Sequence, residues 1–112
     1  MIKITAIIIT KNEELHIERC ISSINNEVDK IVVVDSGSND NTQKICKNMG
    51  VDFYFNEWKG FSNQINWAIN KVESFSDWII CCIVSTDFLV TILYYEKNNF
   101  LLRLSYIFIM PF

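Results

Sequence analysis

The sequence predicts an α/β fold in which a parallel sheet is flanked by helices. Four short runs rich in branched and aromatic residues have the length of strands, and the segments between them place apolar residues at helical spacing. The two patterns alternate along residues 1–84, which is typical of parallel strands joined by right-handed crossovers. The strongest strand signal is also followed directly by a small polar loop.

The first strand and helix are expected within residues 2–26. Residues 2–10 alternate and then become continuously apolar, which fits a central strand. A helix should begin near Asn12 or Glu13, because Asn is a good N-cap and acids suit the positive end of the helix dipole. His16 lies off the apolar stripe of this helix, so we expect a solvated residue rather than a catalytic base. The stripe consists of Ile17, Cys20, Ile21 and Ile24.

Residues 31–34 predict a second strand, buried on both faces of the sheet, because four branched apolar residues follow one another. Asp35 stands where this strand should end. In open α/β sheets, ligands bind outside the carboxyl ends of the strands, so Asp35, Ser36, Gly37 and Ser38 form a candidate ligand-binding loop. The alternative is that Asp35 only caps a turn, since Asp and Ser favour turns through local hydrogen bonds.

The remaining elements continue the same alternation. Asp40 and Gln43 have capping-box spacing for a second helix, and Gly50 is a suitable residue to end it. A short third strand is expected over residues 51–55 and a fourth over residues 78–84. The third helix is predicted from the spacing of Phe61, Ile65, Ala68, Ile69 and Val72.

Composition excludes several classes of protein. The 112 residues carry a net charge of -3, so there is no basic surface for nucleic acid. The cysteines form no CxxC pair and there is one histidine, so a zinc site is not expected. Cys81 and Cys82 lie within an apolar run and indicate core thiols of a reducing compartment. The N-terminus lacks the pattern of a signal peptide, which predicts a cytoplasmic location.

Composition changes sharply near Trp78. Residues 79–112 carry only four charged side chains, and residues 85–112 are apolar without a clear period. We therefore expect two regions: an ordered unit over residues 1–84, and an irregular tail over 85–112 that is out of frame, truncated or otherwise altered. A membrane hairpin is the alternative for the tail, although Asp87 and Arg103 interrupt runs shorter than the about 20 residues of a spanning helix.

Four blocks in order along the chain resemble family 2 glycosyltransferases. These enzymes use a nucleotide-sugar donor on a GT-A fold, whose N-terminal half is a Rossmann-like sheet. The likeness is strongest to the bacterial subgroup that adds sugars to lipopolysaccharide core and similar envelope glycans. The blocks are IIITKNEE (7–14), IVVVDSGSNDNT (31–42), EWKGF (57–61, followed by Gln64 and Asn66) and DWII (77–80).

The resemblance implies a nucleotide pocket at the ends of the first two strands. Asp35 would accept a hydrogen bond from the base, typically the uracil of a UDP-sugar, because the base offers an imide N–H. The small residues after it would allow close approach of the ligand. The implied nucleotide-binding residues are Thr10, Lys11, Asn12, Glu13, Asp35, Ser36, Gly37, Ser38, Gln64 and Asn66.

The chain departs from the family pattern at two places. The family usually carries a cation that faces the diphosphate just before the Asn66 position, and this chain has Ile65. The family also places a DxD motif after its fourth strand, whose carboxylates hold Mg²⁺ or Mn²⁺. Here residues 81–87 follow instead, with a lone Asp87. Magnesium or manganese is therefore expected for the family, but no metal ligand and no catalytic residue is assigned in this chain.

The resemblance implies inverting transfer of a sugar from a nucleotide donor to an envelope glycan or glycolipid. It further implies a location at the inner face of the bacterial membrane, with peripheral association. The chain alone is expected to be inactive, because the resemblance covers only the nucleotide-binding half. Alternatives are a non-catalytic nucleotide-binding remnant and a protein attached to the membrane through its tail. A different flavodoxin-like or Rossmann-like module is disfavoured, since no GxGxxG or P-loop pattern occurs.

Overall fold

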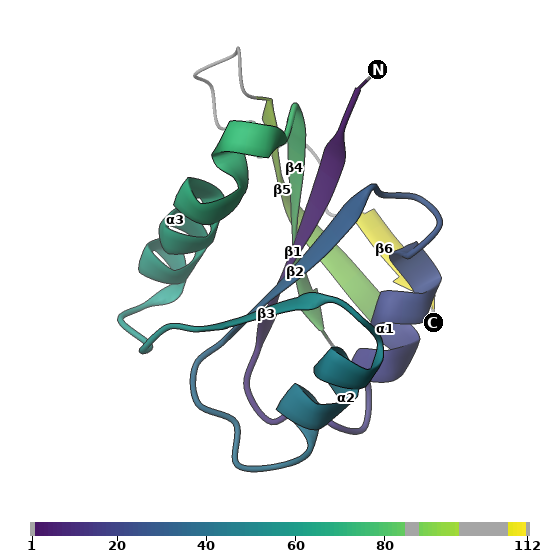
Figure 1. Ribbon diagram of the computed structural model, residues 1–112, viewed down its shortest axis with the longest axis vertical. Helices are drawn as coiled ribbons and strands as arrows, with labels where there is room; N and C mark the ends of the chain where they lie inside the picture. Colours follow the sequence, from purple (N-terminus) through teal and green to yellow (C-terminus); the bar gives the residue numbers. More distant parts are fainter. Residues whose placement is uncertain (1, 85–87, 97–107, 112) are drawn as a thin grey trace.

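The computed structural model describes residues 2–84, 88–96 and 108–111, and these form a six-stranded sheet with helices on its two faces (Figure 1). The strand order is β3-β2-β1-β4-β5-β6. The elements in chain order are β1 (Ile4–Thr10), α1 (Ile17–Ile24), β2 (Lys30–Asp35), α2 (Thr42–Asn48), β3 (Asp52–Phe55), α3 (Phe61–Val72), the 3-10 turn η1 (Glu73–Phe75), β4 (Trp78–Val84), β5 (Phe88–Glu96) and β6 (Phe108–Pro111).

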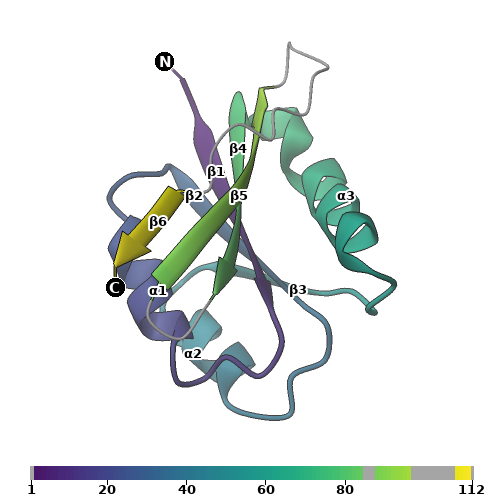
Figure 2. The ribbon, with the colours of Figure 1, turned by 180° about the vertical axis from the view of Figure 1, so that it is seen from behind.

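The first four strands are parallel, as the alternating sequence pattern predicts. β1 lies at their centre, where Ile7 is in register with Val32 of β2 and with Cys81 of β4. Helices α1 and α2 cover one face and α3 covers the other, so the sheet is seen between them in Figures 1 and 2. The α/β fold class is therefore confirmed.

Two apolar layers follow from the alternation of side chains along each strand. Ile8 and Val33 pack with α1 and α2, while Ile7 and Val32 pack with α3, and all four are fully buried. Residues 31–34 of β2 are thus buried on both faces of the sheet, as their sequence predicts. All four cysteines are buried thiols in these layers. Burial raises the pKa of Cys46 to about 11 and that of Cys81 to about 12, so both stay protonated at neutral pH.

Helix α1 begins later than the sequence predicts. Asn12 has a φ of 54°, a left-handed conformation, and lies in the loop four residues before the N-cap of the helix. A turn follows in which the amides of His16 and Ile17 both donate to the Glu13 carbonyl, and the helix starts at Ile17. His16 becomes the N-cap residue and is partly buried, so the expectation of a solvated position within the helix was wrong.

The start of α2 also differs from the predicted capping box. Asn41 is the N-cap residue and makes no side-chain cap hydrogen bond. Asp40 instead accepts a hydrogen bond from the Thr42 amide at 3.0 Å and one from the Thr42 hydroxyl, which fixes the turn that leads into the helix. The predicted end of the helix is confirmed, because Gly50 has a φ of 76° directly after the final turn.

The tail contains two strands where the sequence analysis expected irregular structure, and there the expectation was wrong. β5 pairs antiparallel with β4, and β6 pairs antiparallel with β5. A physical reason is that β4 would otherwise be an open sheet edge with unpaired backbone groups. The sequence of β5, FLVTILYYE, is rich in the β-branched and aromatic residues that favour strands. Asp87 and Arg103 lie outside the described residues.

In the part of the chain that the structure describes, no helix is both long and apolar enough to cross a membrane.

Candidate functional site

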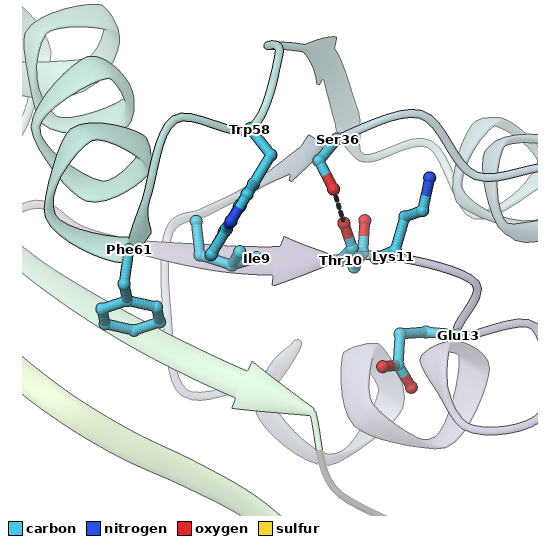
Figure 3. A pocket seen from close by; sticks show the side chains of 7 residues that line it. All are labelled: Ile9, Thr10, Lys11, Glu13, Ser36, Trp58 and Phe61. Atoms are coloured by element: carbon cyan, nitrogen blue, oxygen red, sulfur yellow. Dashed lines mark hydrogen bonds between the residues drawn. The ribbon is translucent and has the colours of Figure 1, made fainter.

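A cavity of about 460 Å³ lies at the carboxyl ends of β1 and β2, beside the first turn of α3 (Figure 3). This is the position at which open α/β sheets bind ligands. Its volume falls within the range of roughly 300–1,000 Å³ that is usual for small-molecule sites. The described residues that line it are Ile9, Thr10, Lys11, Glu13, Ser36, Trp58 and Phe61.

Four of the nucleotide-binding residues predicted from the sequence line this cavity: Thr10, Lys11, Glu13 and Ser36. Thr10 ends β1, Lys11 and Glu13 follow it, and Ser36 comes directly after β2, more than twenty residues further along the chain. Ser36 links the two loops directly, because its amide donates to the Thr10 carbonyl at 3.2 Å and its hydroxyl approaches the same oxygen at 3.4 Å. The tertiary structure therefore brings the predicted polar residues together.

Further hydrogen bonds join the two loops along their length. The amide of Asn12 donates to the Ser38 hydroxyl at 2.8 Å, and its side-chain carbonyl accepts from the Asn39 amide at 2.8 Å. The amide of Glu13 donates to the Thr42 hydroxyl at 2.9 Å. Asn12 and Ser38 thus hold the loops in place without lining the cavity themselves, and the rim of the cavity is built in advance of any ligand.

Asp35, the last residue of β2, accepts the hydrogen bonds that shape the loop after this strand. Its side chain is buried, with 3% exposed, and each of the two carboxylate oxygens accepts two hydrogen bonds. One oxygen accepts from the hydroxyls of Thr10 (2.7 Å) and Ser38, and the other from the amides of Gly37 (2.9 Å) and Ser38 (2.7 Å). Gly37 has a φ of 109°, which favours glycine at this turn. In this conformation the carboxylate organises the loop, as the turn-capping alternative proposes.

Glu13 is the anionic group that lines the cavity. Partial burial raises the pKa of its carboxyl group; the charge of His16 opposes this shift and that of Asp40 adds to it. The carboxylate makes no hydrogen bond with the described residues, so it can accept one from a ligand. Asp40, whose charge acts on Glu13, is itself held by hydrogen bonds. Although desolvation acts to raise the pKa of Asp40, hydrogen bonds from Thr42 and from the Glu14 amide lower it overall.

Lys11 is the cationic residue among the described residues that line the cavity. Its Nζ donates to the Gly37 carbonyl at 2.6 Å, and the side chain is exposed at the rim. An ammonium group has three N–H donors. One is used for the loop, so two remain for an anionic or carbonyl group of a ligand.

The apolar wall of the cavity consists of Ile9, Trp58 and Phe61, none of which the sequence analysis assigned to the site. Figure 3 shows Trp58 reaching from the loop before α3 toward Ile9 at the end of β1. In the sequence, Trp58 and Phe61 belong to the EWKGF block that resembles the family, but the resemblance assigned no role to either residue. Trp58 and Phe61 are about fifty residues away from the end of β1 in the chain, so their positions in the sequence gave no indication that they lie beside it.

The predicted site residues on α3 lie elsewhere. Gln64 is fully buried and exchanges hydrogen bonds with Asn56, whose side-chain amide donates to Gln64 at 2.8 Å. Asn66 is exposed, and neither residue lines the cavity. Ile65, at the position of the expected cation, is 3% exposed and packs in the layer between α3 and the sheet.

The residues that the structure describes include no cluster of three or more His, Cys, Asp or Glu side chains able to hold a metal ion. By themselves, these residues supply no such cluster for the Mg²⁺ or Mn²⁺ that the family resemblance implies. Asp87, the one acid near the end of β4 in the sequence, lies outside the described residues.

Comparison with known sequences places these features in a family. The family described as Glycosyl transferase family 2 matches residues 5–82. An uncharacterized glycosyltransferase of Rickettsia felis is 43% identical over 80 residues, which cover 71% of this chain and 28% of the relative. The SPbeta prophage-derived glycosyltransferase SunS of Bacillus subtilis is 35% identical over 80 residues, which cover 68% of this chain and 18% of the relative. The matched part of the chain thus spans only 18% to 28% of the length of these relatives.

Solved structures show the same fold. Glucosyl-3-phosphoglycerate synthase from Mycobacterium tuberculosis, in complex with Mn²⁺, UDP and glucosyl-3-phosphoglycerate, superposes with a TM-score of 0.63 at 22% sequence identity. The match covers 77% of this chain and 34% of that one. The family match covers most of the described parallel sheet, and the sheet has the fold of such enzymes. This chain therefore belongs to glycosyl transferase family 2.

Proposed function

We propose that the cavity binds the nucleotide part of a UDP-sugar donor. The observation that carries this proposal is the set of groups around one cavity at the carboxyl ends of β1 and β2. Glu13 offers a free acceptor, Lys11 offers donors, and Ile9, Trp58 and Phe61 offer an apolar wall. A uridine nucleotide has a planar base with an N–H donor, ribose hydroxyl donors and an anionic phosphate, so it offers a counterpart for each of these groups. The structural neighbour in complex with UDP supports the choice of nucleotide.

Glu13 is proposed as the acceptor for a ligand donor, either the base imide or a ribose hydroxyl. Its carboxylate is unused by the described residues and partly desolvated, which strengthens a hydrogen bond that it accepts. Asp35 was predicted for this contact from the family resemblance. That role stays a prediction, and it would require Asp35 to give up some of its four loop hydrogen bonds.

Titration calorimetry with uridine and UDP tests the proposal. We expect both to bind, and Glu13→Gln to weaken uridine binding about tenfold, which corresponds to about 1.4 kcal/mol and the loss of a charge-assisted hydrogen bond. Glu18→Gln, on the exposed face of α1, is the matched control and should bind as the parent does. Failure of uridine and UDP to bind, or equal affinity of Glu13→Gln and the parent, would contradict the proposal.

The pH dependence of uridine binding gives an independent check. Uridine carries no phosphate, so its own charge does not change as acid is added. The ionised carboxylate is the accepting form, and the pKa of Glu13 is raised. Affinity should therefore begin to fall at a higher pH than for an ordinary Glu as the solution is acidified, and Glu13→Gln should remove this dependence.

For the whole protein we propose transfer of the donor sugar to a glycan or glycolipid acceptor, such as lipopolysaccharide core, with inversion. Family membership supports sugar transfer, while the acceptor and the stereochemistry rest on the sequence resemblance alone. We further propose that the protein acts in the cytoplasm at the inner face of the membrane, in peripheral association. We propose that the 112-residue chain alone binds nucleotide without transferring sugar. A non-catalytic nucleotide-binding remnant is therefore the second candidate function.

A further inference from the structure

Trp58 is a large aromatic residue whose position the packing of the domain does not explain. It lies in the loop between β3 and α3, and 51% of it is exposed. Its indole makes no hydrogen bond and no ring contact with any residue that the structure describes. The exposed half of the indole leaves apolar surface in water, and a ligand that covers this surface gains free energy on binding.

Trp67 shows the contrast. It lies on α3, where its ring meets the Tyr54 ring edge to face at a centroid distance of 6.0 Å, and Lys71 Nζ lies 4.9 Å from its ring centre. Trp67 therefore contributes to the packing between α3 and the sheet edge. Trp58 faces the cavity instead, together with Ile9 and Phe61.

The surroundings of Trp58 indicate what covers it. Across the cavity lie the polar side chains of Thr10, Glu13 and Ser36, so one wall is an aromatic plane and the other carries hydrogen-bonding groups (Figure 3). A planar heterocycle with polar atoms on its edge satisfies both walls at once. Its face covers the indole while its edge reaches the hydroxyl and carboxylate groups.

We propose that Trp58 stacks on the nucleobase of the bound nucleotide and so contributes to selecting a nucleotide ligand. This inference rests on the proposed function of the cavity. Stacking on an aromatic side chain tolerates any base, because every base has a flat face. Discrimination between bases would then come from the polar wall, and Trp58 would supply affinity.

The test uses Trp58→Ala and Trp58→Phe in the full chain, with calorimetry of uridine, UDP and UDP-glucose. Removing one base–aromatic stack should weaken all three ligands by roughly 5- to 150-fold in Trp58→Ala, while Trp58→Phe should retain most of the affinity. Phe75→Ala is the matched control: Phe75 is 39% exposed, packs against Lys30 and does not line the cavity. We expect the control to bind as the parent does.

Intrinsic fluorescence supplies a second readout. The chain has three tryptophans, at positions 58, 67 and 78. Uridine should change the emission of the parent and of Trp67→Phe, and this change should disappear in Trp58→Phe. Because Trp58 lies on a loop and is half exposed, we expect both of its variants to keep the thermal unfolding midpoint of the parent.

The outcomes separate this inference from the proposed function. If the parent binds uridine and Trp58→Ala binds it equally well, the stacking inference is wrong and the proposed function stands. If Trp58→Ala weakens only UDP-glucose, the indole contacts the sugar and the inference is equally wrong. If the parent binds none of the three ligands, both fail.

Discussion

Asp35 stabilises the loop after β2 by accepting four hydrogen bonds while almost completely buried. A carboxylate can accept all of them because it has acceptor sites on both oxygens. The residues that donate come from the same loop and from Thr10 at the end of β1. The charge of a buried acid is therefore matched by local donors rather than by a cationic partner, which is the usual condition for burying a polar group.

Asp35→Asn should consequently destabilise the domain. The amide is nearly isosteric, but its NH₂ group faces N–H and O–H donors and leaves them unsatisfied, which should lower the free energy of unfolding by about 1–3 kcal/mol. Urea denaturation followed by circular dichroism measures this loss.

Asp52→Asn is the control for that experiment. Asp52 pairs with Lys30 at 2.9 Å, but the two side chains are 44% and 41% exposed, so the loss should stay within about 1 kcal/mol. An unfolding free energy of Asp35→Asn equal to that of the parent would show that the four hydrogen bonds contribute no net stability.

Helix α3 illustrates how register along one element decides what a residue does. Residues adjacent in a helix point in directions about 100° apart, as follows from 3.6 residues per turn. Ile65 therefore faces the sheet and is buried, whereas Asn66 is exposed. A cation at position 65 would enter the apolar layer that contains Ile7 and Val32 rather than reach a diphosphate.

Ile65→Arg should therefore fail to restore the family's cation. It would place a charge in the core without a partner, at a cost of several kcal/mol, and should greatly lower the urea midpoint. Asn66→Arg, one position further along the same helix, should leave the midpoint nearly unchanged. A stable Ile65→Arg variant that binds UDP more tightly than the parent would show that this part of α3 moves to present the cation to the ligand.

At the scale of the whole molecule, the chain joins a family 2 sheet to two further antiparallel strands. The family match ends at residue 82, within β4, and β5 and β6 continue the same sheet beyond it. The cavity lies within the matched part, at the ends of β1 and β2 and the start of α3. Nucleotide binding is therefore proposed for this chain by itself, and sugar transfer is not.

Sugar transfer by the purified 112-residue chain should accordingly be undetectable. The reason is positional: transfer needs an acceptor hydroxyl held and deprotonated beside the donor, and these two contributions can each account for several powers of ten in rate. The measurement is release of UDP from UDP-sugars with Mn²⁺ or Mg²⁺ and envelope glycan acceptors, alongside calorimetry to confirm that the donor binds. Metal-dependent transfer would show that residues of the tail, such as Asp87, supply the missing chemistry.

The sequence by itself determined the parallel α/β architecture and indicated where the candidate site lies. Hydrophobic periodicity is a local property, and burial on both faces makes it unambiguous for residues 31–34. The rule that ligands bind at the carboxyl ends of strands pointed to Ser36, and the family resemblance to Thr10; both line the cavity, and their role in binding stays a prediction. The helix boundaries near Asn12 and Asp40 were less predictable. The Asn12 side chain bonds to the loop after β2, and Asp40 accepts hydrogen bonds both from the Glu14 amide across the two loops and from Thr42 at the start of α2.

Only the tertiary structure decided which side chains meet in the cavity. Trp58 and Phe61 reach Ile9 across about fifty residues, and no local pattern records such a contact. One of the four hydrogen bonds to Asp35 likewise comes from the Thr10 hydroxyl, and the pairing of β1 with β2 places Thr10 beside Asp35. β5 pairs with the backbone N–H and C=O groups at the edge of β4, and this edge exists only once the parallel sheet has formed.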